Sequence, residues 1–231
     1  MRDNNLTVYQ NLLKNISFSV EKARKLQLLL SKKVIAQDRV NMPIKYVAGV
    51  DVAYHDKLSI GAAAVFEYAS LRPVELKLAK VETRFPYIPT LLSFREVPAA
   101  ASAIRKLNVK PDVFLVDGQG IAHPYRFGLA SHLGVVLDLC TIGVAKSLLC
   151  GEVIESENPY WKPIVHEGEI VGGAVFTKPD AKPVYVSVGH KISLESAVKV
   201  VLACLKNHRL PEPLHKAHVA AQKAKREKDP K

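Results

Sequence analysis

The sequence predicts an α/β fold, in which a mixed sheet begins with three antiparallel strands, continues with parallel strands and is flanked by helices. Two observations predict the sheet: three strand-like segments follow one another with short links, and a continuous apolar run comes later. Helix-like segments separate the later strands, as they do where helices cover the faces of a sheet. The chain has 231 residues, 48% of them hydrophobic, which is enough for one large core. We therefore expect residues 1–231 to form a single domain.

The first predicted element is a helix at residues 19–33. Ala23, Leu26 and Leu30 fall on one face of it, at the spacing of an amphipathic helix. We expect residues 1–45 to be a helical N-terminal extension within the domain.

Three strands are predicted next, at residues 46–54, 58–68 and 74–84. The links are short, and an Arg-Pro pair at 72–73 supplies a turn before the third strand. Links of this length join antiparallel neighbours, so we expect a meander. Residues 74–78 alternate apolar and polar side chains, which is typical of a strand with one exposed face.

A proline-rich loop separates the meander from a helix. Phe85–Pro89 reads FPYIP and can be neither helix nor central strand, because its two prolines lack N–H donors. A helix is predicted from Thr90 to Leu107, with Thr90 as its N-cap. Pro98 is expected to kink or divide this helix.

The later elements alternate between strands and helices. Residues 113–116 form the apolar run, which is typical of a strand buried on both faces. The remaining predicted elements are a helix at 129–137, a strand at 140–144, a hairpin of 170–177 with 184–188, and a helix at 193–205 capped by Ser193. Three antiparallel strands followed by α-β-α-β is the order of ribonuclease-H-like domains, a likeness of topology that says little about function.

The charge favours a polyanionic partner. Lys and Arg number 33 against 22 Asp and Glu, a formal charge of +11, and such an excess favours contacts with phosphates. Many basic chains bind nothing acidic, so charge alone leaves both interpretations open. From His215 to Lys231 six Lys or Arg stand against Glu227 and Asp229, a net charge of +4. We expect a disordered basic tail at about residues 219–231, although this segment could also follow a nucleic-acid backbone.

Cysteine usage and the lack of apolar leaders indicate a soluble, cytoplasmic protein. Cys140, Cys150 and Cys204 have no CxxC spacing, and their odd number argues against a complete set of disulfides. The N-terminus lacks the apolar core of a signal peptide, and charged residues interrupt the most apolar region, residues 127–150. We expect no membrane association.

Three carboxylates occupy informative positions. Asp51 lies in an apolar strand, on the face opposite Val50 and Val52, and a buried carboxylate needs a partner. Asp117 ends the later apolar strand, where ligands of open α/β sheets collect. Glu96 lies in the helix after the proline-rich loop. Each alone has an ordinary explanation: a structural hydrogen bond or ion pair, the start of a turn, and a solvated helix residue.

Together the three acids predict a metal site. One acid in a first strand, one in the following helix and one at a later strand end is the ribonuclease-H arrangement. Clustered carboxylates repel one another unless a divalent cation neutralises them, and hard oxygen ligands suit Mg²⁺ or Mn²⁺. Such a site can generate a hydroxide nucleophile and stabilise the charge on a phosphodiester.

Six sequence blocks carry a specific family resemblance. They are YVAGVDVAY (46–54), FPYIPTLLSFRE (85–96), VFLVDGQGIAHP (113–124), GVAKS (143–147), VSVGHKIS (186–193) and LPEPLHKAH (210–218). In this order and approximate spacing they resemble endonuclease V, over nearly the whole chain from about Tyr46 to His218. Any one block would be a weak signal, but chance does not readily produce six in order.

The resemblance implies a catalytic set. Asp51 and Asp117 match metal ligands, and Glu96 completes the carboxylate site, with Mg²⁺ as the cofactor and Mn²⁺ able to substitute. His218 matches a position near the metal that is Asp in some relatives; it could ligate or orient a water, or be an exposed histidine of a C-terminal helix. Lys146 matches a lysine beside the scissile phosphate, unless it is one more surface lysine.

The proline-rich loop resembles the wedge of that family, which fills the gap left when a damaged base leaves the stack. It consists of Pro86, Tyr87, Ile88 and Pro89. The prolines would stiffen the loop, and the aromatic ring would replace the lost stacking. The alternative is a surface turn whose tyrosine packs on its own helix.

The DGQG segment resembles the wall of the pocket for the flipped base. Gly118, Gly120 and Ile121 match it, with His123 beside them, and bare amides there could bind a base edge. Hypoxanthine presents the O6 acceptor where adenine has an amino donor, so a donor facing O6 would reject adenine. DGQG alone also suits a tight turn. His190 matches a further family position, for which we expect structural support near the site.

The resemblance implies a metal-dependent endonuclease that flips out inosine, the product of adenine deamination, and initiates repair. It would hydrolyse the second phosphodiester 3′ to the lesion, leaving a 3′-hydroxyl and a 5′-phosphate. Damaged DNA containing deoxyinosine is the expected partner of a monomeric enzyme. Inosine-containing RNA stays open as a substrate, because 2′-OH contacts cannot be read from sequence. A different ribonuclease-H-like nuclease, such as a junction resolvase, and a catalytically silent inosine-binding protein stay open as well.

Overall fold

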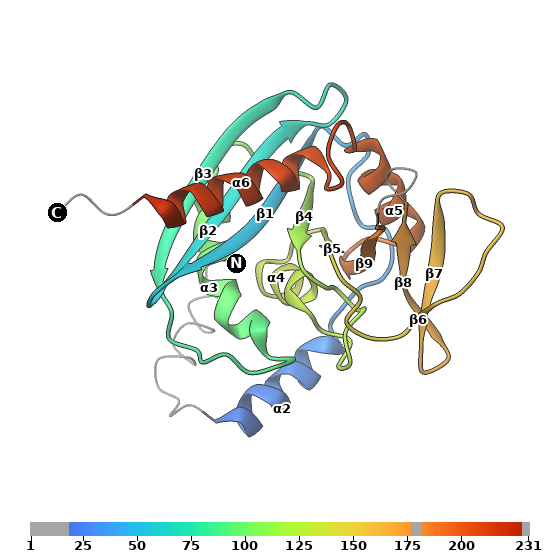
Figure 1. The fold of residues 1–231 in the computed structure, drawn as a ribbon, viewed down its shortest axis with the longest axis horizontal. Helices are drawn as coiled ribbons and strands as arrows, with labels where there is room; N and C mark the ends of the chain where they lie inside the picture. The colour runs from blue at the N-terminus through green and yellow to red at the C-terminus, as the bar shows by residue number, and fades with distance from the viewer. Residues whose placement is uncertain (1–18, 177–181, 228–231) are drawn as a thin grey trace.

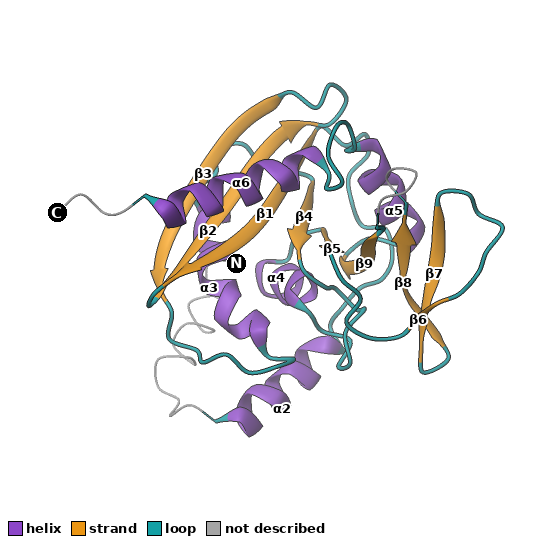
Figure 2. Cartoon of the chain, in the orientation of Figure 1, coloured by secondary structure: helices purple, strands orange, loops and turns teal. Residues whose placement is uncertain are grey.

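A single mixed sheet is the centre of the structure (Figures 1 and 2). The computed structural model describes residues 19–176 and 182–227. In these residues the sheet has nine strands in the order β3-β2-β1-β4-β5-β9-β8-β7-β6. The strands are β1 (Tyr46–His55), β2 (Leu58–Glu67), β3 (Pro73–Glu82), β4 (Val113–Asp117), β5 (Thr141–Ala145), β6 (Glu152–Val153), β7 (Trp161–His166), β8 (Glu169–Val175) and β9 (Val184–His190). The helices are α2 (Val20–Ser31), α3 (Leu92–Arg105), α4 (Leu129–Leu137), α5 (Leu194–Ala203) and α6 (Glu212–Arg226).

The strand pairing confirms the predicted fold class. β1, β2 and β3 form an antiparallel meander. β4 then adds to β1, and β5 to β4, in parallel register. The sheet returns to antiparallel pairing from β5 through β9 to β8.

Helices cover the two faces of the sheet and create two cores. On one face α5 and α6 contribute Val198 and Leu214 to a single apolar cluster. On the other face α3 and α4 contribute Val97 and Leu133 to a second cluster, which Val50 of β1 joins. Figure 1 shows α6 lying across β1, β2 and β3. Successive residues of β1 thus face different helices.

The start of α3 differs from the prediction. The helix begins at Leu92, and its N-cap is Leu91, which makes no side-chain capping bond. Thr90 instead has a left-handed backbone, with φ of 66°, so it ends the preceding loop and cannot cap the helix. Pro98 lies inside the helix, which is not divided there.

The prediction of a disordered tail from about residue 219 is wrong as far as Arg226. α6 extends through these residues and buries small side chains, among them Ala221 and Ala224, against the sheet. Small residues at helical spacing let the helix approach the sheet closely. The lysines between them made this apolar face difficult to recognise in the sequence. Residues 228–231 of the predicted tail lie outside the described residues.

The predicted hairpin of β8 and β9 is confirmed as an antiparallel pair, while Thr177 at its predicted end lies outside the described residues. Two strands were missed, β6 and β7. β6 has two residues and β7 contains Pro163, so neither carries a clear strand pattern. Of the predicted N-terminal extension, residues 1–18 also lie outside the described residues. Among the helices that are described, none is both long and apolar enough to cross a membrane.

Candidate active site

Two aspartates lie side by side on neighbouring parallel strands. Val50 of β1 is in register with Val116 of β4, so the next residues, Asp51 and Asp117, are adjacent at the end of that pairing. Asp51 is 6% exposed, and its Oδ1 accepts the backbone N–H of Val52 at 2.8 Å. Its side chain faces α6, away from the cluster that contains Val50. The alternation of β1 thus places this carboxylate as predicted.

α6 brings a histidine to the aspartates. His218 Nδ1 lies 2.8 Å from Asp51 Oδ2 and 3.8 Å from Asp117 Oδ2. The helix can approach because β1 has a glycine beneath it. A Cβ on Gly49 would lie 2.1 Å from the carbonyl oxygen of Pro213, in the first turn of α6. The close contact between Gly49 and α6 therefore sets the position of His218.

Lys146 completes the cluster from the other side. It follows β5 directly, and its Nζ donates to Asp117 Oδ2 at 2.5 Å. The same Nζ lies 3.4 Å from His218 Nδ1. The lysine side chain is 39% exposed and that of Asp117 is 14% exposed. Lys146 therefore has an accessible positive charge at the edge of a largely buried pair of carboxylates.

The donor set fits a divalent cation. One oxygen each from Asp51 and Asp117 and a ring nitrogen of His218 lie within 4.8 Å of one another. Burial raises the pKa of Asp51, the negative charge of Asp117 raises it further, and the contact with His218 opposes the shift. A cation between the carboxylates would relieve this repulsion. The two carboxylate oxygens suit a hard divalent cation, whereas an imidazole is a more usual ligand for transition metals.

Glu96, the third predicted acid, lies outside this group of three. It projects from α3, on the other side of the sheet from α6, and it interacts with Tyr54 and Arg95. Burial raises the pKa of Glu96 to about 8; the Tyr54 hydroxyl opposes the shift, and the charges of Asp51 and Asp117 add to it. Glu96 is thus close enough to the aspartates for their negative charges to raise its pKa.

The loop of residues 85–90 is anchored by two apolar side chains, while most of its other residues are exposed to solvent. Phe85 and Ile88 pack with Leu91 and Phe94 in a small apolar cluster. Tyr87 is 69% exposed, so most of it is in contact with solvent. Pro86 and Pro89 are exposed as well. This loop therefore presents a largely exposed aromatic residue to solvent.

The loop of residues 118–128 follows Asp117 and differs from the expectation of bare amides. Its backbone N–H groups already have protein acceptors, which bind the loop to β5 and β9. The bonds are Gly118 to the Val144 carbonyl (3.2 Å), Gly120 to Ser187 Oγ (2.8 Å) and Ile121 to the Val188 carbonyl (2.8 Å). A Cβ on Gly120 would lie 2.0 Å from that Val188 carbonyl, so the glycine serves close packing on β9. These amides cannot also donate to a base.

Two polar side chains of this loop differ in their partners. Burial lowers the pKa of His123 to about 4, the charge of Arg24 acts in the same direction, and a hydrogen bond to the backbone of Thr90 opposes them. Its Nδ1 accepts the N–H of Tyr125 at 3.1 Å, so the neutral ring carries its proton on Nε2. The Oε1 of Gln119 is buried with no hydrogen-bond partner among the described residues. Gln119 was not among the residues that the sequence singled out.

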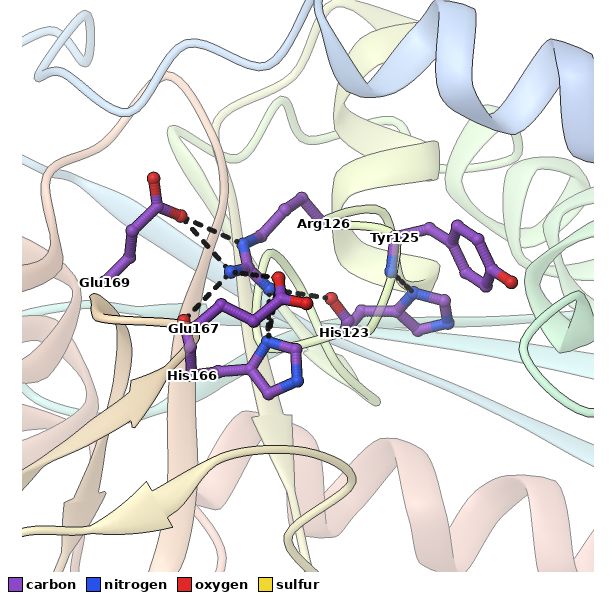
Figure 3. Close-up of polar contacts among 6 residues, drawn as sticks. All are labelled: His123, Tyr125, Arg126, His166, Glu167 and Glu169. Carbon is purple, nitrogen blue, oxygen red and sulfur yellow. Dashed lines mark hydrogen bonds and ion pairs between the residues drawn. The ribbon is translucent and has the colours of Figure 1, made fainter.

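Arg126 ties this loop to the turn between β7 and β8 (Figure 3). Its guanidinium donates to the backbone carbonyl of His166 at 3.0 Å and to Glu169 Oε2 at 3.2 Å. A further bond of 3.3 Å reaches Glu167. Figure 3 shows these groups surrounding the guanidinium, with His123 farther along the same loop. The loop is therefore held at its outer edge by a charged bridge that sequence reasoning did not find.

Two other histidine positions have structural explanations. His190, the last residue of β9, pairs with Thr141, the first residue of β5. Asp117 pairs with Val144, near the other end of β5. The Nδ1 of His190 accepts the N–H of Ile35, so it gives structural support as expected, but to the N-terminal segment at the opposite end of β5 and not near the aspartates. His208 forms a second group of possible metal ligands with Glu212 and His215. There Glu212 accepts the N–H of Asn207 at 3.2 Å, a contact that holds the turn before α6.

Comparisons with known proteins agree on one family. A family model described as endonuclease V matches residues 29–219. The endonuclease V of Trichormus variabilis is 50% identical over 198 residues, which cover 84% of this chain and 90% of that protein.

Solved structures of endonuclease V proteins have the same fold as this chain. The structure of endonuclease V from Streptomyces avermitilis matches with a TM-score of 0.85 at 38% identity, covering 91% of this chain and 95% of that one. Endonuclease V from Ciona intestinalis, in complex with a 24mer DNA containing an inosine followed by a ribo-adenosine, matches with a TM-score of 0.81 at 34% identity. That match covers 89% of this chain and 97% of the Ciona chain.

Proposed function

The chain belongs to the endonuclease V family, and from this membership we propose that it is a divalent-metal-dependent endonuclease that acts at inosine. The observation that carries the proposal is the cluster of Asp51, Asp117 and His218, whose ligand atoms lie within 4.8 Å of one another. We propose that it flips the inosine out and hydrolyses the second phosphodiester on the 3′ side. That chemistry would initiate repair of deaminated adenine.

Asp51, Asp117 and His218 would hold the cation, which we take to be Mg²⁺ with Mn²⁺ as a substitute. When bound, the cation would supply Lewis acidity to the phosphodiester. Lys146 keeps Asp117 in place and can also reach outward to offset charge on the phosphate, since its side chain is partly exposed. Glu96 lies close enough to be influenced by the charges of both aspartates, and we propose that it would orient solvent at the site.

Inosine recognition is assigned to the two loops beside the acids. We propose that the 118–128 loop forms the wall of a base pocket, through its backbone surface at Gly118, Gly120 and Ile121. His123 would support this wall by its bond to the backbone of Thr90. The Oε1 of Gln119 is buried and unpartnered in the described part of the chain, and we propose that it accepts the N1–H of hypoxanthine, which adenine lacks, when the base enters the pocket. A buried polar group left unpaired by the wrong base would disfavour adenine.

The test is nicking of a short duplex that contains one inosine, compared with the same duplex containing adenine. We expect nicking of the inosine strand only, in the presence of Mg²⁺ or Mn²⁺, and none with a chelator. Specific binding without nicking at any divalent concentration would instead indicate an inosine-binding protein. Equal nicking of the adenine strand, or preference for a branched junction, would indicate a different ribonuclease-H-like nuclease.

Inosine-containing RNA is the second candidate substrate. The DNA in the Ciona complex has a ribo-adenosine after the inosine, which makes a 2′-OH contact at that position worth testing. Matched oligonucleotides of DNA, of RNA, and of DNA with one ribonucleotide after the inosine separate the two. Faster cleavage of the last two would show that a 2′-OH contact contributes.

Tyr87→Ala should reduce the preference for inosine without abolishing cleavage. The exposed ring is proposed to replace the stacking of the flipped base, and base–aromatic stacking is worth ~1–3 kcal/mol. The ratio of nicking rates on inosine and adenine duplexes measures the effect. Tyr160→Ala, which removes another exposed tyrosine (62% exposed), is the matched control. A wild-type ratio in the Tyr87 variant would exclude the wedge.

A further inference from the structure

One side chain of α2 joins the two recognition loops. Gln27 is fully buried, and its Nε2 donates to the carbonyl of Thr90 at 2.8 Å and to the carbonyl of Phe127 at 3.1 Å. Thr90 ends the 85–90 loop and Phe127 is near the end of the 118–128 loop. The amide of Gln27 therefore uses both its protons to link segments that are far apart in the chain. Both carbonyls would lose this donor without it.

Arg24, one turn earlier on α2, strengthens the same junction. Its guanidinium contacts Gln27 Oε1 and donates to Thr90 Oγ1 at 2.7 Å. It also stacks over the ring of Tyr125, with 3.7 Å from Cζ to the ring centroid. Arg24 thus contacts the 85–90 loop through Thr90 and the 118–128 loop through Tyr125. A planar guanidinium can make these contacts at once, which an ammonium group cannot.

Thr90 needs such support because its backbone is strained. A β-branched residue rarely adopts a positive φ, and Thr90 has a φ of 66°. Arg24, Gln27 and His123 all bond to this residue. The surrounding contacts thus hold the point at which the 85–90 loop turns into α3.

We propose that Arg24 and Gln27 are positioning residues that fix the 85–90 loop against the 118–128 loop, so that wedge and base pocket act on one nucleotide as a unit. The expected effect on inosine recognition rests on the proposed function. The contacts that link the two loops do not depend on it. Both residues precede residue 29, where the match to the family model begins. Because neither bonds to the Asp51 cluster within the part of the chain that the structure describes, their loss should affect recognition and leave the response to metal unchanged.

Hydrogen exchange measured by mass spectrometry tests the link without any substrate. In Arg24→Ala we expect faster exchange in both loops, at residues 85–91 and 118–128, while the strands keep their protection. Lys25→Ala is the control, since Lys25 is on the same helix with a side chain that is 75% exposed. Faster exchange in one loop only, or in neither, would overturn the proposal. Gln27→Leu, which keeps the volume and removes both donors, should act in the same way.

Nicking kinetics test the consequence. We expect Arg24→Ala to lower the inosine-to-adenine ratio of kcat/KM about tenfold, the size of one charge-assisted hydrogen bond, mainly through KM. The Mn²⁺ concentration for half-maximal activity should not change. Arg24→Lys should behave like Arg24→Ala; recovery of the wild-type ratio by Lys would mean that only charge matters and would overturn the proposal. A wild-type enzyme without inosine preference would refute the proposed function, while the exchange result would still decide whether the loops are coupled.

Discussion

Asp51→Asn and Asp117→Asn should each lower inosine-directed nicking by on the order of 10³-fold, about 4 kcal/mol of transition-state stabilisation. Each change removes a negative charge and keeps the shape of the side chain. Burial raises the pKa of Asp51 and the negative charge of Asp117 adds to the shift, so the two carboxylates repel one another and a cation should bind strongly only while both are present. Affinity for Mn²⁺ should therefore fall together with turnover.

Calorimetry with Mn²⁺ and single-turnover nicking across a metal titration provide the measurement. Asp56→Asn is the matched control, because Asp56 is at the turn after β1 with a side chain that is 85% exposed. The aspartate variants should fold, since each loses a like-charge contact along with the charge of its contact to Lys146 or His218, and circular dichroism checks this. Near wild-type nicking in either variant at ordinary Mg²⁺ concentration would exclude this cluster as the metal site.

Lys146→Ala should lower the nicking rate by on the order of 10²-fold, the loss usual for one electrostatic group at a reacting centre. Lys146 donates to Asp117 Oδ2, and its side chain remains partly exposed, so its charge can also face the phosphate. Its removal should reduce kcat at saturating metal, whereas a lost ligand could be rescued by more metal.

The control for this variant is Lys199→Ala, which removes a lysine from an exposed ion pair on α5. Rescue of Lys146→Ala to full activity by raised Mg²⁺ would place the lysine in metal binding and contradict a role at the phosphate. His218→Asn gives a useful comparison, because His218 contacts both aspartates and belongs to the proposed ligand group.

Local pattern was sufficient to predict the strands that position the acids. The apolar run before Asp117 and the alternation around Asp51 reflect burial on one or both faces, which is a property of neighbours along the chain. The helix at α4 and the Ser193 cap of α5 were predictable for the same reason. These elements place the two aspartates at adjacent strand positions.

Contacts between segments that are distant in the chain could not be predicted from local sequence patterns. Gln27 bonds to residues 63 and 100 positions away, and nothing in its helix marks it as more than an amphipathic residue. The amides of the 118–128 loop were expected to be free because their acceptors on β5 and β9 come much later in the chain. The segment after residue 219 was predicted to be disordered because its charged residues are the most prominent feature of its sequence. Its buried residues are alanines, which have little apolar area and so give only a weak amphipathic pattern.

The identity of the bond that breaks tests the proposed chemistry most directly. Mass spectrometry of the products from a duplex with one inosine reports both the position of the cut and the fate of the base. We expect a cut at the second phosphodiester 3′ to the inosine, with a 3′-hydroxyl, a 5′-phosphate and hypoxanthine still joined to its sugar. Free hypoxanthine, or a product with an abasic sugar, would contradict hydrolysis of the backbone at the Asp51 and Asp117 cluster.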